Sequence, residues 1–136
     1  MHFSKKTSFL LAHLALFVVF FWFGFLKFFG VSPANELVRE LLLMIPIMNL
    51  WSFESFIIVL GLVEVMIAIL LLFPKTTKYG VAILIPHMLT TLLPLFLLPA
   101  IVWQQAFVPT LEGQYIIKNI VIVALALSVV LERKSK

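Results

Sequence analysis

The sequence predicts an all-α protein, a membrane-embedded four-helix bundle with a short amphipathic helix in the outer first loop. Three observations support this class. Hydrophobic residues make up 63% of the 136 residues and charged residues only 12%, so polar side chains cannot cover a water-facing surface. The mean hydropathy is +1.18. Finally, four apolar runs have nearly the ~20 residues that a helix needs to cross a bilayer.

The four predicted spans cover residues 9–29, 53–73, 81–102 and 113–131. The first run continues through bulky aromatic residues without a small-residue cleavage site, so we expect a retained helix and not a signal peptide. The third run is the least regular, because it contains three prolines. Neighbouring helices and hydroxyl groups can satisfy the carbonyls that proline frees in a membrane helix. The length predicts one transmembrane domain, residues 1–136.

The loop between the first two spans contains SPANELVRELLLM, residues 32–44, which predicts a short helix. Ser32 is the expected cap, Pro33 takes the first position and Glu36 lies in the first turn. The expected apolar face is formed by Leu37, Leu41 and Met44. Such a helix is typical of a membrane interface, and we expect it to cap the bundle and not to bind a partner.

Basic residues predict the orientation of the chain. Seven of the ten flank the predicted spans on one side, namely Lys5, Lys6, Lys75, Lys78, Arg133, Lys134 and Lys136. The positive-inside rule therefore places both termini in the cytoplasm. The net charge of +4 follows this distribution and forms no basic patch, so we expect no nucleic-acid binding. The absence of cysteine excludes disulfides and thiol chemistry.

Glu64 and His87 form the candidate intramembrane polar site. An ionisable group inside a span is costly unless it faces the bundle interior or has a partner. Counting 1.5 Å per residue places these two side chains at nearly the same depth. Thr90 and Thr91 lie on the same helical face as His87. Two interpretations stay open, a functional site and a buried structural hydrogen bond.

A second candidate site is an outer charge cluster, consisting of Lys27, Glu54, Glu112 and Lys118. Lys27 shares a helical stripe with His13 and Gly24, so it is expected to face inward. The same count separates Lys27 from Glu64 by about 13 Å. The sequence therefore predicts that Lys27 pairs with Glu54 or Glu112. The alternative for Lys27 and for Lys118 is that the side chain extends to the membrane interface.

Metal and common catalytic sites are not predicted. His13 and His87 are single histidines at different depths and lack the spacing of zinc ligands. The sequence contains no GxSxG motif, no phosphate-binding loop and no close carboxylate pair. We expect no metal, and we favour a protein without catalytic activity of its own.

Three segments resemble the DoxX-like membrane proteins, and in particular the bacterial inner-membrane family that includes the reactive-chlorine resistance membrane protein. They are FWFGFLKFFG, GLVEVMIAILLLF and VPTLEGQYIIKNIVIVALAL. The resemblance covers nearly the whole chain, although the outer first loop is shorter than in many members. The matched motif positions are Gly24, Leu26 and Lys27, then Gly61 and Glu64, then Gly113, Ile117, Lys118 and Asn119.

The resemblance implies a bacterial inner-membrane protein that supports resistance to oxidative or reactive-chlorine stress, or that anchors a partner. The first alternative is a quinone-binding membrane subunit of an oxidoreductase, in which Glu64 and His87 handle protons. The weaker alternative is a small proton-coupled transporter. The expected surroundings are the lipid bilayer, with a membrane or soluble redox partner or a homo-oligomer as alternatives. Quinone is the cofactor that the oxidoreductase alternative implies.

Overall fold

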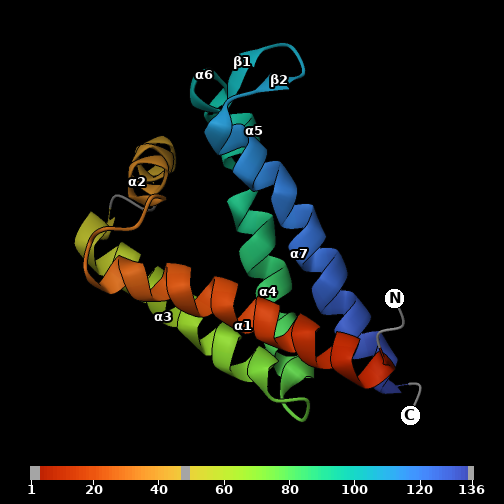
Figure 1. Ribbon diagram of the computed structural model, residues 1–136. Coiled ribbons are helices and arrows are strands. Elements are labelled where there is room, and N and C mark those ends of the chain that lie inside the picture. The colour runs from red at the N-terminus through yellow and green to blue at the C-terminus, as the bar shows by residue number, and fades with distance from the viewer. Residues whose placement is uncertain (1–3, 47–49, 135–136) are drawn as a thin grey trace.

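The computed structural model describes residues 4–46 and 50–134, and it confirms the predicted fold class (Figure 1). Four helices are long and apolar enough to span a membrane. They are α1 (Lys5–Phe28), α3 (Phe53–Leu72), α4 (Thr77–Thr91), continued by α5 (Pro94–Leu97), and α7 (Leu111–Lys134). The chain is therefore a multi-pass membrane protein, and its apolar spans place it in a lipid bilayer.

Serine side chains start two of the spans. Ser4 accepts a hydrogen bond from the backbone N–H of Thr7, and Ser52 accepts one from Ser55. Each bond satisfies one of the N–H groups that have no partner within the helix. At the other end of α1, Gly30 takes the left-handed backbone conformation, with φ of 68°. This is the usual glycine termination of a helix.

The predicted loop helix is present as α2 (Asn35–Met44), but its buried face differs from the prediction. Leu42 is the buried residue, and Met44 is 58% exposed. The three consecutive leucines at 41–43 explain the error, because a pattern of apolar spacing cannot choose among them. The guanidinium carbon of Arg39 lies 4.0 Å from the ring centroid of Phe53, which connects α2 to α3.

The third span begins earlier than predicted and is interrupted. Pro86 lies inside α4, whereas Pro94 and Pro99 each begin a separate short helix, α5 and α6 (Pro99–Val102). A proline has no N–H to donate and fits the first position of a helix. An unpredicted antiparallel hairpin follows, formed by β1 (Trp103–Gln105) and β2 (Val108–Pro109).

The long helices pack as two pairs that meet in one core. α1 lies beside α3, and α4 lies beside α7 (Figure 1). The core joins all four helices and includes Leu16, Phe20, Ile67, Ala68, Leu71, Val81, Leu84, Met88, Ala126 and Val129. The start of α1, the end of α7 and the α3–α4 turn lie toward one end of the molecule, here called the basic end. α2 and the β-hairpin lie toward the other, the hairpin end.

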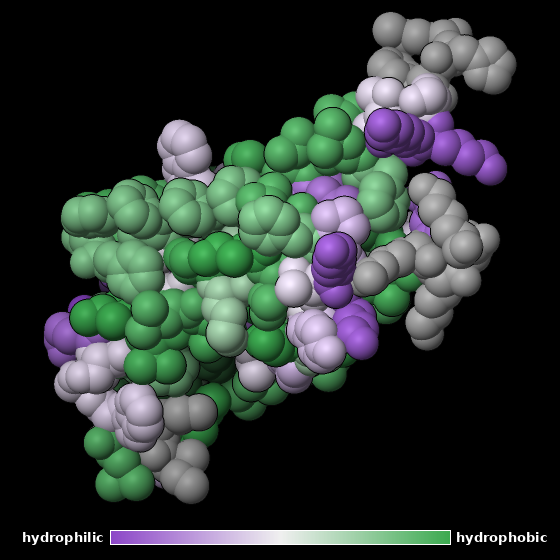
Figure 2. Space-filling view, turned by 90° about the horizontal axis from the view of Figure 1, so that it is seen from below, coloured by the Kyte–Doolittle hydropathy of each residue, from purple (hydrophilic) through white to green (hydrophobic). Residues whose placement is uncertain are grey.

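The sides of the helices expose large apolar residues. Leu10, Trp22, Leu62, Ile69 and Val121 are each at least 48% exposed. Figure 2 shows a largely green surface with a few purple side chains, most of them on the right of the view. Such a wide apolar surface is found where lipid, and not water, covers a protein.

Candidate functional site

Close contact between α1 and α3 is the basis of the site. A Cβ atom added to Gly61 would lie 2.8 Å from the carbonyl oxygen of Gly24. A Cβ atom added to Gly24 would lie 2.9 Å from Cβ of Glu64. Small residues at such positions allow membrane helices to approach backbone to backbone. The glycines therefore bring the side chains that follow them, Lys27 and Glu64, into reach of each other.

Lys27 and Glu64 form a buried ion pair between α1 and α3. The Nζ atom of Lys27 lies 2.6 Å from Oε2 of Glu64. The same ammonium group donates a hydrogen bond to the carbonyl oxygen of Phe23, at 3.3 Å. Lys27 is 3% exposed and Glu64 is 8% exposed. A charge buried in apolar surroundings is very costly without a partner, so this pair is a contact that neither helix can provide alone.

His87 brings α4 to the same glutamate. Its Nε2 atom lies 3.4 Å from Oε1 of Glu64. The ring of Phe20 packs edge-on to the imidazole, with 6.2 Å between the ring centroids. Glu64 thus has one oxygen facing the lysine and the other facing the histidine. We refer to these three residues as the Lys27–Glu64–His87 cluster.

The structure brings Glu64 and His87 together, as the depth count predicted, but the predicted partners of Lys27 are wrong. The count assumed that the outer ends of α1 and α3 lie at one level. In the structure, the Phe28 ring reaches to 3.4 Å from a Cβ atom placed on Gly61. The eight residues 53–60 of α3 therefore extend beyond the end of α1 by about 12 Å. This offset places Gly24 beside Glu64 and Lys27 beside Gly61, so the Lys27 side chain reaches Glu64.

The outer charge cluster does not form. Glu54 and Glu112 are exposed, in the first turns of α3 and α7. Lys118 is also exposed, with Nζ 5.7 Å from the ring centroid of Tyr115. The ion pairs recorded for residues 4–46 and 50–134 join Lys27 and His87 to Glu64 and include none of these three.

Thr90 and Thr91 support the helix next to the cluster. Thr90 Oγ1 donates to the His87 carbonyl at 2.6 Å, and Thr91 Oγ1 donates to the Met88 carbonyl at 2.7 Å. Asn119 on α7 in turn donates from Nδ2 to Thr91 Oγ1, at 3.2 Å. This connection between helices was not predicted, although a polar amide within the fourth span was a signal for it.

His13 lies away from the cluster and holds the end of α3. Its Nδ1 atom is hydrogen-bonded to the carbonyl oxygen of Leu71. The ring of Phe9 packs edge-on to it, with 4.5 Å between centroids. Its Nε2 atom is buried and makes no hydrogen bond within the described part of the chain. Among the same residues, no group of three histidine, aspartate or glutamate side chains could hold a metal ion.

The cluster can hold charge and protons within the apolar interior. Glu64 accepts from the Lys27 ammonium, and its other carboxylate oxygen faces an imidazole nitrogen that can carry a proton. All three residues are at most 8% exposed, so water has little access to them. The arrangement is typical of either a structural lock between helices or a proton-handling site.

Fold and site together define a small integral membrane protein with four candidate spans and a buried ionisable cluster at the contact of α1, α3 and α4. No protein-family model matches the chain, and neither a curated protein nor a solved structure matches it.

Proposed function

We propose that this chain is a DoxX-like protein of the bacterial inner membrane that supports resistance to oxidative or reactive-chlorine stress. In this proposal it acts without catalysis of its own, by anchoring or assembling a partner protein. Both termini, and with them the basic end, face the cytoplasm. The hairpin end then faces the opposite side of the membrane.

The observation that carries the proposal is the contact between two segments that resemble the family. Gly24 and Lys27 come from the first segment, and Gly61 and Glu64 come from the second. The two glycines touch, and the two charged residues pair at 2.6 Å. The motif residues thus form one physical unit, which is a reason for them to occur together in a sequence.

The closed geometry of the cluster favours a structural role over a catalytic one. The Lys27 ammonium group donates to Glu64 and to the Phe23 carbonyl, and the His87 imidazole also faces Glu64. A reacting group would have to displace one of these partners. A cluster whose charged groups have their partners inside the protein suits a chain that holds a partner protein at the membrane.

Deletion of the gene in its host, followed by a hypochlorite challenge, tests this proposal. We expect lower survival, restored by the wild-type gene and by Leu62→Ala, a change at a 55% exposed position. Glu64→Leu should fail to restore survival, because it leaves Lys27 without its partner. Purification of the tagged protein should also recover a specific partner by mass spectrometry. Unchanged survival of the deletion strain would contradict the proposal.

A second candidate function is a quinone-binding membrane subunit of an oxidoreductase. The contact between Glu64 and His87, beside the ring of Phe20, favours it. Quinone reduction consumes protons, and an acid–imidazole pair can supply them. The test is extraction of the purified protein for quinone, followed by a titration with added quinone. A protein that carries no quinone and binds none would exclude this function.

A further inference from the structure

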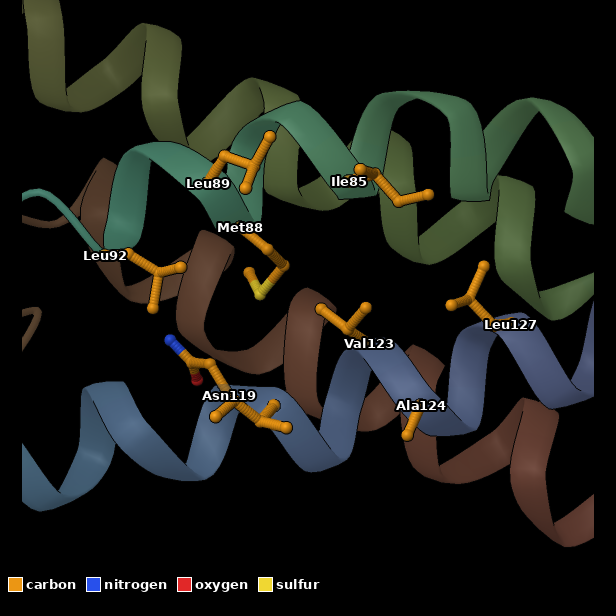
Figure 3. Close-up of a pocket in the computed structure, with 9 residues that line it drawn as sticks. Ile85, Met88, Leu89, Leu92, Asn119, Val123, Ala124 and Leu127 are labelled. Carbon is orange, nitrogen blue, oxygen red and sulfur yellow. The ribbon is translucent and has the colours of Figure 1, made fainter.

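An open apolar groove runs along the contact between α4 and α7. Its volume is about 320 Å³. Figure 3 shows Ile85 and Met88 on one wall and Val123 and Leu127 on the other. Of the nine lining residues, Asn119 is the polar one, and it lies near one end (Figure 3). Such a lining excludes a hydrated ligand and suits a hydrocarbon chain.

The length of the groove suits one segment of an acyl chain. From Asn119 to Leu127 are eight residues of α7, or about 12 Å. The groove is open along its side, so a chain can enter it from the lipid.

The lining face of α4 continues to a lysine at the basic end. Lys78 precedes Ile85 by seven residues and Leu92 by fourteen, so all three lie on one stripe of the helix. Lys78 is exposed, and its Nζ atom lies 4.7 Å from the ring centroid of Tyr79. Two helical turns, or about 10 Å, separate it from Ile85.

The basic end offers charge complementarity to an anion. Lys75 is exposed in the α3–α4 turn, three residues before Lys78. Lys5 and Lys6 are exposed at the start of α1, toward the same end (Figure 1). Of the six glutamates in the sequence, only Glu132 lies in a helix turn near this end. Clusters of basic residues next to membrane spans attract anionic lipids.

We propose that the α4–α7 groove and the basic end form a binding site for one anionic phospholipid. One acyl chain lies in the groove, against Ile85, Met88 and Val123. The phosphate of the head group lies at the basic end, where Lys78 and Lys75 bind it. The site is independent of the stress-resistance proposal, since it uses neither the Lys27–Glu64–His87 cluster nor a protein partner.

Native mass spectrometry of the full chain in detergent tests the site. The probes are phosphatidylglycerol, phosphatidylcholine with the same acyl chains, and glycerol phosphate, which has no chains. We expect one tightly bound phosphatidylglycerol, roughly twentyfold preferred over phosphatidylcholine, because two lysines contribute. Glycerol phosphate alone should not bind. Equal binding of the two lipids, or binding of glycerol phosphate as tight as that of the lipid, would overturn the proposal.

Two variants locate the lipid, each with a matched control. Lys78→Gln should lower phosphatidylglycerol affinity roughly fivefold, while Lys118→Gln, at an exposed lysine outside the basic end, changes it little. Ala124→Phe should fill the groove and weaken both lipids, while Val121→Phe, at a 68% exposed position outside the groove, should not. Variants and controls that lose equal affinity would refute the site.

A photo-crosslinking lipid provides a test on the unmodified protein. A phosphatidylglycerol with a diazirine in its acyl chain should label the segments 85–92 and 119–127. Labelling spread evenly over all four spans would contradict the proposal.

Discussion

Removal of one partner of the buried ion pair should destabilise the protein far more than removal of both. In Lys27→Met, Glu64 loses the ammonium group and keeps the contact with His87, at 3.4 Å. In Glu64→Leu, the ammonium group keeps, within the described part of the chain, the Phe23 carbonyl at 3.3 Å. Breaking a buried pair in this way costs about 3–5 kcal/mol, because the remaining charge is left uncompensated.

The double variant Lys27→Met/Glu64→Leu removes both charges and keeps similar side-chain volumes. Replacing a buried pair by apolar residues is often neutral in its effect on stability. His87 then loses its hydrogen-bond acceptor, which lowers the free energy of unfolding by about 1–3 kcal/mol. We therefore expect the double variant to lose only about 1–3 kcal/mol of its free energy of unfolding, less than either single variant. The coupling free energy should be about 3 kcal/mol or more.

Reversible unfolding by dodecyl sulfate in mixed micelles, followed by far-ultraviolet circular dichroism, measures these free energies. Leu62→Ala, a change at a 55% exposed position of α3, serves as the control, and its own cost should be small. If the effects of the two single substitutions add to within about 0.5 kcal/mol, the residues do not interact. That result would refute the ion pair as a stabilising contact.

Three further predictions use other parts of the structure. Gly61→Ala should lower the free energy of unfolding by about 1–3 kcal/mol and weaken the ion pair, because the added methyl group would lie 2.8 Å from a carbonyl oxygen of α1. Thermal unfolding in detergent tests this, and an unchanged melting temperature would contradict it. His13→Leu should lower the free energy of unfolding by about 1–3 kcal/mol, because it removes the hydrogen bond to a carbonyl at the end of α3. Hydrogen exchange should then be faster in the α3–α4 turn, and exchange as slow as in the wild type would count against this role. Because the chain has no cysteine, Lys75→Cys and Phe107→Cys can report topology; an impermeant maleimide added to whole cells should label only the latter, and the reverse pattern would invert the proposed orientation.

The spans were predictable because they depend on composition and length. A bilayer requires long apolar helices, and four such runs are visible without any tertiary information. The hairpin was not predictable, because its turn lacks the Asn-Gly or Asp-Gly pair that marks tight hairpins. Instead, Phe107 takes a positive φ of 61° at the tip.

Depth counting found one contact of the cluster and missed the other. Glu64 and His87 lie on helices joined by a short turn, so counting from that turn keeps their relative level. Lys27 and Glu64 lie on helices separated by residues 29–52, and nothing in the sequence sets the offset between them. The offset depends on the contact of Gly24 with Gly61, which is a property of packing.

The Lys27–Glu64–His87 cluster also bears on how the chain enters the membrane during synthesis. Lys27 emerges 37 residues before Glu64. Alone at the centre of an inserting helix, either residue costs about 2.5–3.5 kcal/mol. Lys27 lies in the last turn of α1, so its ammonium group can stay at the membrane interface before α3 is inserted. Insertion of α1 and α3 as one pair of spans avoids both costs, and α4 then completes the cluster as the third span to enter the membrane.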